Sequence, residues 1–319
     1  MSRIAVLGAG AWGTAIALQA LRAGHDVTLV ARDASKAGAM RQNLANPRLP
    51  GIALPEALRI ADTVPANPDI VFVAVPTQHI RANMDRLPGT VPVIACAKGV
   101  EVGTHMLPLE ILADAGPTRP LAMLTGPNFA HEVAASLPAA SVVASTDAAL
   151  REDVRLAVGT PAFRIYGNDD PVGAQLGGAA KNVIAIAAGA VTGAGLGENA
   201  RAALITRGLT ELSRLTLALG GKAETVMGLS GLGDLLLTCT GAASRNFSLG
   251  VELGEGRDLS AILTSRTGVT EGVTTAAALV ARAGAVDMPI CRAVAALLAG
   301  TLTLPDAMRQ LLSRPQRDE

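Results

Sequence analysis

Short apolar runs alternate with helical patterns over the first half of the chain. The runs lie at residues 4–7, 27–31, 70–75, 92–97, 121–126 and 141–145. Continuous apolar runs are typical of strands buried on both faces, and helical segments between successive strands favour parallel pairing. The pattern therefore predicts a doubly wound parallel sheet with helices on both of its faces.

The pattern changes after a last strand-like run at residues 163–170. From Pro171 onward the apolar residues recur at helical spacing. The helices that this spacing predicts cover residues 171–193, 199–219, 244–254, 271–283 and 289–299. We therefore expect an α/β chain of two domains, a Rossmann-type domain at residues 1–175 and an all-helical domain at residues 176–319. The last residues, 313–319, are expected to form a frayed tail.

Length and composition agree with two domains and exclude one class of partner. The chain has 319 residues, of which 50% are apolar and only 2% aromatic, so its cores must be built mainly from aliphatic side chains. Lys plus Arg and Asp plus Glu each number 27, which gives a formal net charge of zero. No stretch is basic enough to follow a phosphate backbone, so we expect no nucleic acid partner.

The cysteines and the apolar stretches indicate a cytoplasmic location. Cys96, Cys239 and Cys291 stand far apart without metal-ligand spacing, so we expect neither disulfides nor a metal site. The first residues show no pattern of a signal peptide. The longest uncharged stretch, residues 182–197, is shorter than the roughly 20 residues that span a bilayer, so a buried helix is expected there.

A glycine motif follows the first predicted strand. Gly8, Gly10 and Gly13 fit the pattern GxGxxG, and the next predicted helix begins within it. In this context the backbone N–H groups and the positive end of the helix can bind a pyrophosphate. The alternative is a tight turn with close helix packing and no ligand. The motif predicts a dinucleotide site at the N-terminus.

Two charged residues after the second predicted strand bear on the choice of dinucleotide. Arg32 suits the 2′-phosphate of NADP, whereas an acidic residue such as Asp33 suits the ribose hydroxyls of NAD. NADP is therefore favoured and NAD stays possible, while Arg32 could also be a solvated loop charge. Trp12, inside the glycine motif, could cover the cofactor or serve in packing.

Two lysines stand in apolar surroundings. Lys98 follows a predicted strand, at the sheet edge where α/β proteins bind ligands, although such a lysine is often only solvated. Lys181 lies on the apolar helix at residues 171–193, where an ammonium group needs a partner or an aqueous cleft. The alternative for Lys181 is a side chain that reaches solvent from the helix end.

Polar residues farther along complete a candidate site. Asp234 stands between a glycine-rich turn and an apolar run, a poor place for an unpaired carboxylate. Ser244, Arg245 and Asn246 could open a helix and bind an anion such as phosphate, or Ser244 could simply cap that helix. These residues indicate hydride transfer to the carbonyl of a phosphorylated small molecule, with a lysine as proton donor. No histidine is assigned a role.

The chain resembles the bacterial NAD(P)-dependent sn-glycerol-3-phosphate dehydrogenases. The resemblance extends over nearly the whole chain, and its most specific stretches are "IAVLGAGAWGTAIA", "LTGPNFAHEVA", "AAKNVIAIAAGAVTGAGLGENARAALITRGLTE" and "GLSGLGDLLLTCTGAASRN". It implies reduction of dihydroxyacetone phosphate to sn-glycerol 3-phosphate for glycerophospholipid biosynthesis, in a cytoplasmic homodimer. It also implies a helical domain like the C-terminal domain of 6-phosphogluconate dehydrogenase.

The resemblance also assigns roles to individual residues. It implies that Lys181 is the catalytic acid and base and that Lys98 and Asp234 orient and polarise the substrate. The residues implied to contact glycerol phosphate are Gly126, Asn128, Ser244, Arg245 and Asn246. Besides Gly8, Gly10 and Gly13 of the motif, the residues implied to line the NAD(P) site are Ala11, Trp12, Arg32, Lys98, Ala130, Arg245, Val269 and Glu271.

This sequence departs from the family pattern at two places, and two other functions stay open. Asn128 stands where the family commonly has Ser or Thr, and the basic residues that often follow Ser-Arg-Asn are missing after Asn246. One alternative is a 3-hydroxyacid-type dehydrogenase of the same architecture, which would need a site for a carboxylate. The other is an NAD(P)-sensing module without catalysis, in which Lys181 would not be expected.

Overall fold

The structure, a computed structural model, describes residues 1–266 and 268–313. Its N-terminal part is an eight-stranded sheet with the order β3-β2-β1-β4-β5-β6-β7-β8. The strands are β1 (Arg3–Leu7), β2 (Asp26–Val30), β3 (Arg59–Ala61), β4 (Ile70–Val73), β5 (Val93–Ala95), β6 (Leu121–Thr125), β7 (Ala139–Ala144) and β8 (Phe163–Asn168). This is the predicted Rossmann-type sheet, with the strand order reversing between β1 and β4.

One strand pair differs from the expected parallel arrangement. β6 and β7 pair antiparallel, whereas the other neighbouring strands pair parallel. The connection between them holds only the helix α4 (Ala130–Ala134), which spans about 7.5 Å at 1.5 Å per residue. Parallel neighbours are usually joined by a crossover that contains a long helix packed on the sheet, and this five-residue helix is too short for that role. β7 runs in the opposite direction, which a short connection allows.

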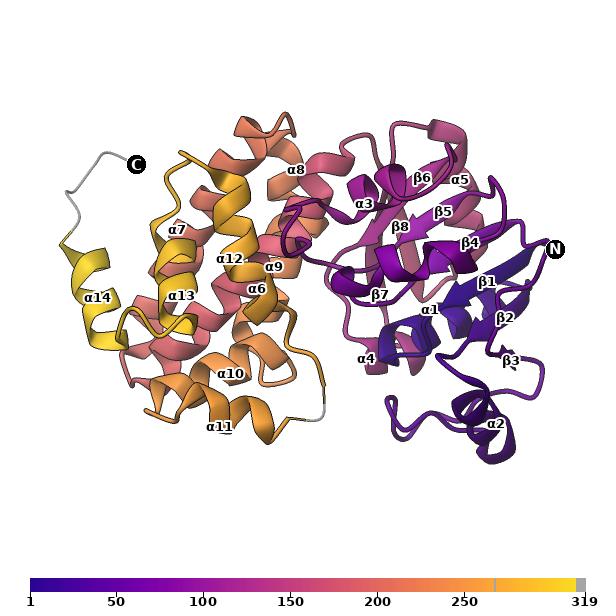
Figure 1. The fold of residues 1–319 in the computed structure, drawn as a ribbon, viewed down its shortest axis with the longest axis horizontal. Coiled ribbons are helices and arrows are strands. Elements are labelled where there is room, and N and C mark those ends of the chain that lie inside the picture. The colour runs from indigo at the N-terminus through magenta and orange to yellow at the C-terminus, as the bar shows by residue number, and fades with distance from the viewer. Residues whose placement is uncertain (267, 314–319) are drawn as a thin grey trace.

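Helices cover both faces of the sheet, as the continuous apolar strands predict (Figure 1). One face, with Ile4 and Val6 of β1, packs against α1 (Ala11–Arg22) and α5 (Ala148–Val158). The other face, with Ala5 and Leu7, packs against the 3-10 turn η2 (Arg81–Arg86) and α3 (Pro108–Asp114). The helix α2 (Ala34–Asn43) follows β2, and the turn η1 (Thr77–His79) follows β4.

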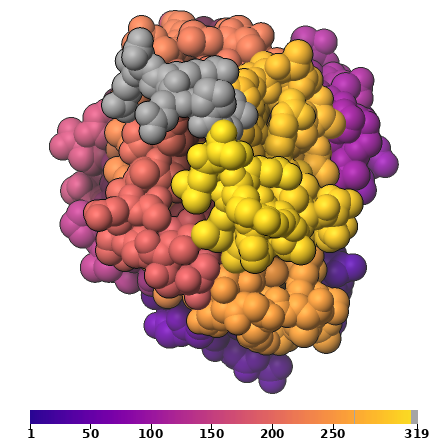
Figure 2. Space-filling view, turned by 90° about the vertical axis from the view of Figure 1, so that its left-hand side faces the viewer, coloured from indigo at the N-terminus to yellow at the C-terminus, as the bar shows by residue number. Residues whose placement is uncertain are grey.

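The C-terminal part is helical. Its helices are α6 (Pro171–Gly193), α7 (Gly197–Ala218), α8 (Ala223–Met227), α9 (Asp234–Thr240), α10 (Arg245–Gly254), α11 (Leu259–Thr264), α12 (Glu271–Ala283), α13 (Pro289–Leu298) and α14 (Leu304–Leu312), with a π-helical turn, η3 (Leu229–Gly233), before α9. Figure 2 shows α14 on the outer surface of this part. The chain is therefore a Rossmann-type domain followed by a helical domain, as predicted.

The central helix of the second domain is α6. It begins at Pro171 because the preceding Asp170 caps it, with its side chain accepting from Gly173 N at 2.8 Å. By length and composition α6 could cross a membrane, but 83% of its most apolar window is buried inside the molecule. It is a core helix, as the sequence predicts.

Glycines let α6 and α10 pack with their backbones in contact. A Cβ on Gly189 of α6 would lie 2.0 Å from Phe247 O, and a Cβ on Gly250 of α10 would lie 2.1 Å from Ile186 O. Any side chain at either position would therefore separate the two helices. This packing fixes the place of Lys181 on α6 relative to the start of α10.

The predictions missed several short elements. β3 was not expected, because three residues that include Arg59 give no clear apolar run. α8, α9, α11 and α14 were also not expected, and they are the shorter helices of this domain. The predicted division at residue 175 falls inside α6, which begins at Pro171. Residues 314–319 of the predicted frayed tail lie outside the described residues.

Candidate active site

Two lysines and one carboxylate from distant parts of the chain meet between the two domains. The Nζ atom of Lys98, which follows β5, donates to Asp234 Oδ2 at 2.6 Å and to Gly126 O at 3.0 Å. The Nζ atom of Lys181 on α6 donates to Asp234 Oδ1 at 2.5 Å and to Thr238 Oγ1 at 2.9 Å. Each oxygen of the carboxylate thus binds one lysine.

This cluster is nearly closed to solvent. The side chain of Asp234 is fully buried, and those of Lys181 and Lys98 are only 10% and 14% exposed. Burial lowers the pKa of Lys181 from its ordinary value of 10.5 to about 8, and the charge of Lys98 adds to this effect while Asp234 opposes it. An amine with a pKa near 8 can give and take a proton close to neutral pH.

The turn η3 brings Asp234 to the lysines. Asp234 is the first residue of α9 and directly follows this π-helical turn. A Cβ on Gly177 of α6 would lie 2.2 Å from Ser230 O, so η3 lies directly against the α6 backbone one turn before Lys181. Such π-turns are frequent at functional sites. The glycine-rich stretch therefore serves to place the carboxylate against α6.

A second polar network adjoins the lysines. Asn246 Nδ2 donates to Asn182 Oδ1 at 2.9 Å, and Asn182 Nδ2 donates to Glu271 Oε2 at 3.4 Å. Asn246 Oδ1 accepts from Gly272 N at 2.9 Å. Burial raises the pKa of the Glu271 carboxyl, and the charges of Arg245 and of the two lysines oppose that rise. The network joins α6, α10 and α12 beside the lysine cluster.

The three residues of the predicted anion site lie in different settings. Ser244 caps α10, with its Oγ accepting from Phe247 N at 3.2 Å. The side chain of Asn246 is buried in the network just described. Arg245 is exposed, and a Cβ on Gly268 would lie 2.8 Å from its Nη1. Of the three residues, Arg245 is exposed, whereas Ser244 and Asn246 are buried.

Gly126 and Asn128 lie beside Lys98. Gly126 has φ +133°, and its carbonyl oxygen accepts a hydrogen bond from Lys98 Nζ. Asn128 Nδ2 donates to Ser141 Oγ at 2.7 Å, whereas its buried Oδ1 has no hydrogen-bond partner within the residues that the structure describes. A buried acceptor without a partner costs free energy, so this Oδ1 atom is a source of local instability beside Lys98.

The glycine motif fits a dinucleotide pyrophosphate. A Cβ on Gly13 would lie 1.9 Å from Gly8 O, so this glycine is required for the close approach of α1 to the turn. At Gly10 a Cβ would meet nothing within 4 Å, which leaves room for a ligand. No side chain caps the N-terminus of α1, and its first turn has no acidic residue. The amides of Ala11 and Trp12 can therefore bind an anion.

The remaining predicted cofactor residues are spread around this turn and across the domain junction. Arg32 is exposed just beyond β2, while Asp33 caps α2 by accepting from Lys36 N at 2.9 Å. Trp12 and Ala130 are partly buried and pack against the core on the α1 side of the sheet. Val269, in the helical domain, is 49% exposed.

Two further residues of the candidate site were missed by the sequence analysis. Asn46 Nδ2 donates to Ala9 O at 3.1 Å and to Thr14 Oγ1 at 2.7 Å, so this buried side chain braces the glycine turn. Its one sequence signal is the turn-forming pair with Pro47. Thr238, a hydrogen-bond partner of Lys181, lies one helical turn after Asp234, a spacing that could have been noticed.

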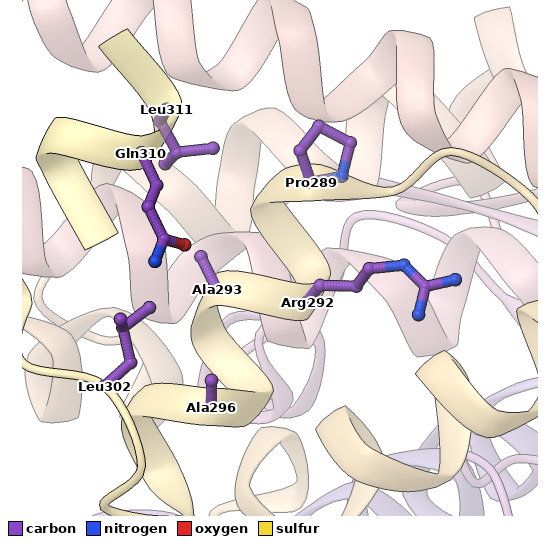
Figure 3. A pocket seen from close by; sticks show the side chains of 7 residues that line it. All are labelled: Pro289, Arg292, Ala293, Ala296, Leu302, Gln310 and Leu311. Atoms are coloured by element: carbon purple, nitrogen blue, oxygen red, sulfur yellow. The ribbon is translucent and has the colours of Figure 1, made fainter. Parts of the chain in front are cut away.

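A surface depression elsewhere is separate from these residues. It has a volume of about 320 Å³ and lies between α13 and α14. Its lining residues are Pro289, Arg292, Ala293, Ala296, Leu302, Gln310 and Leu311, drawn in Figure 3. None of the predicted site residues is among them. The candidate active site is therefore the lysine cluster between the domains.

Comparisons with known proteins agree with this placement. The family model of the NAD-dependent glycerol-3-phosphate dehydrogenase N-terminus matches residues 3–151, and that of the C-terminus matches residues 170–309. A glycerol-3-phosphate dehydrogenase (NAD(P)+) of Acidiphilium cryptum is 55% identical over 99% of this chain and 98% of its own length. One of Gluconobacter oxydans is 49% identical, also over 99% of this chain and 98% of its own length.

One solved structure supports the same family, and another shows that the fold also occurs in a different enzyme. A crystal structure of glycerol-3-phosphate dehydrogenase from Coxiella burnetii is 37% identical and covers 98% of this chain and 99% of its own, with a TM-score of 0.92. A ketopantoate reductase from Ralstonia eutropha, 18% identical, covers 97% of this chain and 99% of its own with a TM-score of 0.60, and shares the fold alone. The chain belongs to the NAD-dependent glycerol-3-phosphate dehydrogenase family.

Proposed function

We propose that the protein is an oxidoreductase that reversibly reduces dihydroxyacetone phosphate to sn-glycerol 3-phosphate with a nicotinamide cofactor. The observation on which this rests is the contact of Lys98 and Lys181, one from each domain, with the buried carboxylate of Asp234. Family membership supports the reaction, because the relatives that match over 99% of this chain are named glycerol-3-phosphate dehydrogenase (NAD(P)+). It disfavours both the 3-hydroxyacid dehydrogenase and the non-catalytic sensor.

Lys181 is the proton donor in this proposal. The nicotinamide, when bound, supplies the hydride to the carbonyl carbon of the substrate. The ammonium group of Lys181 gives its proton to the carbonyl oxygen, and the neutral amine takes it back in the reverse reaction. Asp234 holds this ammonium in place, and Lys98 polarises the substrate from the other side of the carboxylate. Burial of the cluster strengthens both electrostatic effects.

Arg245 binds the substrate phosphate in this proposal. Its guanidinium is open to solvent at the N-terminus of α10, where free amides and the helix dipole also favour an anion. Ser244 and Asn246 also contact the glycerol phosphate, Asn246 chiefly at its phosphate, and their side chains hold that helix end in place. Gly126 and Asn128 contact the glycerol moiety beside Lys98.

The cofactor lies along the glycine turn and reaches the lysine cluster. The motif glycines, with Ala11 and Trp12, bind the pyrophosphate, while Ala130, Val269 and Glu271 line the path to the nicotinamide. Arg32 binds the 2′-phosphate, so NADP is preferred to NAD. Asp33 could favour NAD by binding its ribose hydroxyls, but its side chain instead caps α2 by accepting from Lys36 N.

Replacing Arg32 with alanine is expected to lower the preference for NADPH. Loss of one charge-assisted hydrogen bond should reduce the ratio of kcat/KM with NADPH to kcat/KM with NADH by about tenfold. The matched control is Arg164→Ala, since Arg164 lies on β8 at the opposite edge of the sheet from β2 and β3. An unchanged ratio in Arg32→Ala would mean that another residue reads the 2′-phosphate.

The pH dependence of the reaction should reflect Lys181. Its pKa in the folded protein is lowered to about 8, and reduction needs the protonated amine. The kcat/KM for reduction should therefore be constant at low pH and fall above about pH 8, whereas kcat/KM for oxidation should rise through the same range. Initial rates measured in both directions test this. A reduction rate that stays constant up to the ordinary pKa of lysine would contradict the assignment.

An initial-rate assay tests the proposed function itself. The protein should oxidise NADPH or NADH when dihydroxyacetone phosphate is added, and a 2-oxo acid without phosphate should give no comparable rate. Faster turnover of the 2-oxo acid would favour a hydroxyacid-type dehydrogenase instead. Binding of NADPH without turnover of any substrate would favour the cofactor sensor.

The setting of the enzyme is part of the same proposal. A dehydrogenase with this substrate would supply the backbone of glycerophospholipids from the cytoplasm, working as a homodimer. The division into a cofactor domain at residues 1–175 and a substrate domain at residues 176–319 assigns the glycine turn to the first and Lys181, Asp234 and Arg245 to the second. Sedimentation of the purified protein tests the dimer.

A further inference from the structure

The segment from Lys98 to Glu110 leaves the sheet, reaches the helical domain and returns to α3 on the face of the sheet (Figure 1). Lys98 stands at its start and binds Asp234, as described above. Val100 and Leu107 are fully or almost fully buried, and both belong to the core of the helical domain. The segment that holds Lys98 is therefore packed into the core of the other domain.

The segment lies against two helices of that domain, α6, where a Cβ on Gly178 would lie 3.0 Å from Lys98 Cγ, and α12. A Cβ on Gly99, the residue after Lys98, would lie 2.9 Å from Thr275 Oγ1 of α12. Ala276 and Leu279 of the same helix share the buried core with Val100. The first residue of α12 is Glu271, which reaches the polar network beside Lys181. A displacement of α12 would thus move both sides of the candidate site.

One ion pair fastens α12 to the segment. Arg282 Nη1 and Nη2 donate to the two oxygens of Glu110 at 2.7 and 2.6 Å, and Nη1 also donates to His105 O at 3.0 Å. Glu110 Oε2 accepts from Leu107 N at 2.8 Å as well, so the carboxylate is itself fixed to the backbone of the segment. A bidentate pair of this kind defines distance and angle together.

We propose that Arg282 and Glu110 are positioning residues of the reaction, which hold Lys98 at Asp234 by clamping α12 to the segment at residues 98–110. This inference rests on the proposed function, because Lys98 must act on the substrate for its position to affect turnover. Neither residue touches the lysine cluster, so their effect passes through the backbone of the segment and through α12.

A further hydrogen bond joins the segment to the helical domain, from Leu109 N to Gln175 Oε1 of α6 at 2.8 Å, and several join it to the first domain. Gln78 Nε2 donates to Val100 O at 2.8 Å, and Arg81 binds Glu101 through Nε and Nη2 at 3.0 and 2.8 Å. These partners lie in the turns η1 and η2 of the first domain. Without Arg282 the segment would keep its shape and lose this polar link to α12.

Loss of the clamp is expected to lower kcat and to change the pH profile. A shift of Lys98 by about 1 Å can cost up to roughly a hundredfold in rate, so Arg282→Ala should lower kcat at least about tenfold. The charged groups that face Lys181 are Asp234 of α9, Lys98 of the segment and Glu271 of α12. Withdrawal of Lys98 removes a repulsion and admits water, and both changes raise the pH above which reduction fails.

The experiment compares Arg282→Ala and Arg282→Lys with a matched control, Arg292→Ala. Arg292 donates to Gly284 O and Val286 O within the helical domain, so its loss should leave kcat unchanged. The measurements are kcat with dihydroxyacetone phosphate, the pH profile, the dissociation constant of NADPH and Tm. NADPH binding should be unchanged, and Tm should fall by no more than about 2–4 °C.

Two further results separate positioning from simple destabilisation. Added guanidinium ion should restore part of the rate of Arg282→Ala, and Arg282→Lys, which keeps the charge, should retain more of it than alanine does. A folded Arg282→Ala protein with the kcat and pH profile of the wild type would overturn the inference while leaving the proposed function intact. A wild-type protein that does not reduce dihydroxyacetone phosphate would instead overturn the proposed function.

Discussion

Replacing Lys181 with alanine is expected to lower kcat for the reduction of dihydroxyacetone phosphate by about 10²–10⁴-fold, the usual contribution of a positioned general acid. The buried ammonium of Lys181 lies 2.5 Å from Asp234, and removing it leaves Lys98 as the lysine that binds this carboxylate among the described residues. A lysine held by Asp234 at the other oxygen is not placed to replace it. NADPH should still bind, because the glycine turn lies in the first domain.

The measurement pairs steady-state rates with a direct titration of NADPH binding. Lys222→Ala is the matched control, since Lys222 is an exposed lysine that also binds one carboxylate, Asp169, at 2.8 Å. Removal of such a surface pair changes stability by about 0–1 kcal/mol at most and should leave kcat unchanged. Near-normal activity in Lys181→Ala would remove this residue from the reaction.

Replacing Asp234 with asparagine should have the second-largest effect, on both rate and stability. An amide offers one acceptor where the carboxylate offers two, so one of the two lysines would face an N–H group. Breaking a buried ion pair by removing one partner typically lowers the free energy of unfolding by about 3–5 kcal/mol. We expect kcat to fall by about 10²-fold or more, because neither lysine keeps its position.

Urea unfolding and initial rates measure these two effects separately. The control is Asp169→Asn, which removes the exposed carboxylate of the Lys222 pair. If Asp234→Asn unfolds too readily for kinetics, saturating NADPH should stabilise the folded state enough to measure the rate. An unchanged stability together with an unchanged rate would show that Asp234 does not hold the two lysines.

The long elements could be predicted because their local signals agree. The helix at 171–193 was predicted with the bounds that α6 has, since Asp170 caps it and Pro171 suits its first turn. The same holds for α12 at 271–283, which ends before Gly284 in a left-handed conformation with φ +56°. Elements without such signals were missed. α9, for example, follows a glycine-rich turn that gives no helical pattern.

The site could be predicted as a set of residues but not as an arrangement. Lys181 and Asp234 stand out because a charge lies in an apolar stretch, and Lys98 because it follows a predicted strand. Asp234 lies 53 positions from Lys181 and 136 from Lys98, so no local pattern could show that both lysines bind its two oxygens. That geometry depends on how η3 and the segment after β5 meet α6, which is a property of the folded chain.

The hydrogen bonds that Ser244, Arg245 and Asn246 make within the protein could not be predicted from the sequence. Ser244 is a helix cap, as its position at the start of a helix allows, and Asn246 is engaged by Asn182 and Gly272. Arg245 between them keeps its guanidinium open to solvent. From the sequence, all three residues are assigned to one anion site. Spacing alone does not show which side chains at a helix N-terminus form hydrogen bonds within the protein.

Transfer of a labelled hydride tests the central claim most directly. The protein is incubated with dihydroxyacetone phosphate and NADPH that has deuterium at the transferred position of the nicotinamide, and the product is analysed by mass spectrometry and NMR. The account predicts sn-glycerol 3-phosphate with one deuterium, bound to C2. A product without deuterium at C2, or no reduced product while the cofactor is bound, would contradict it.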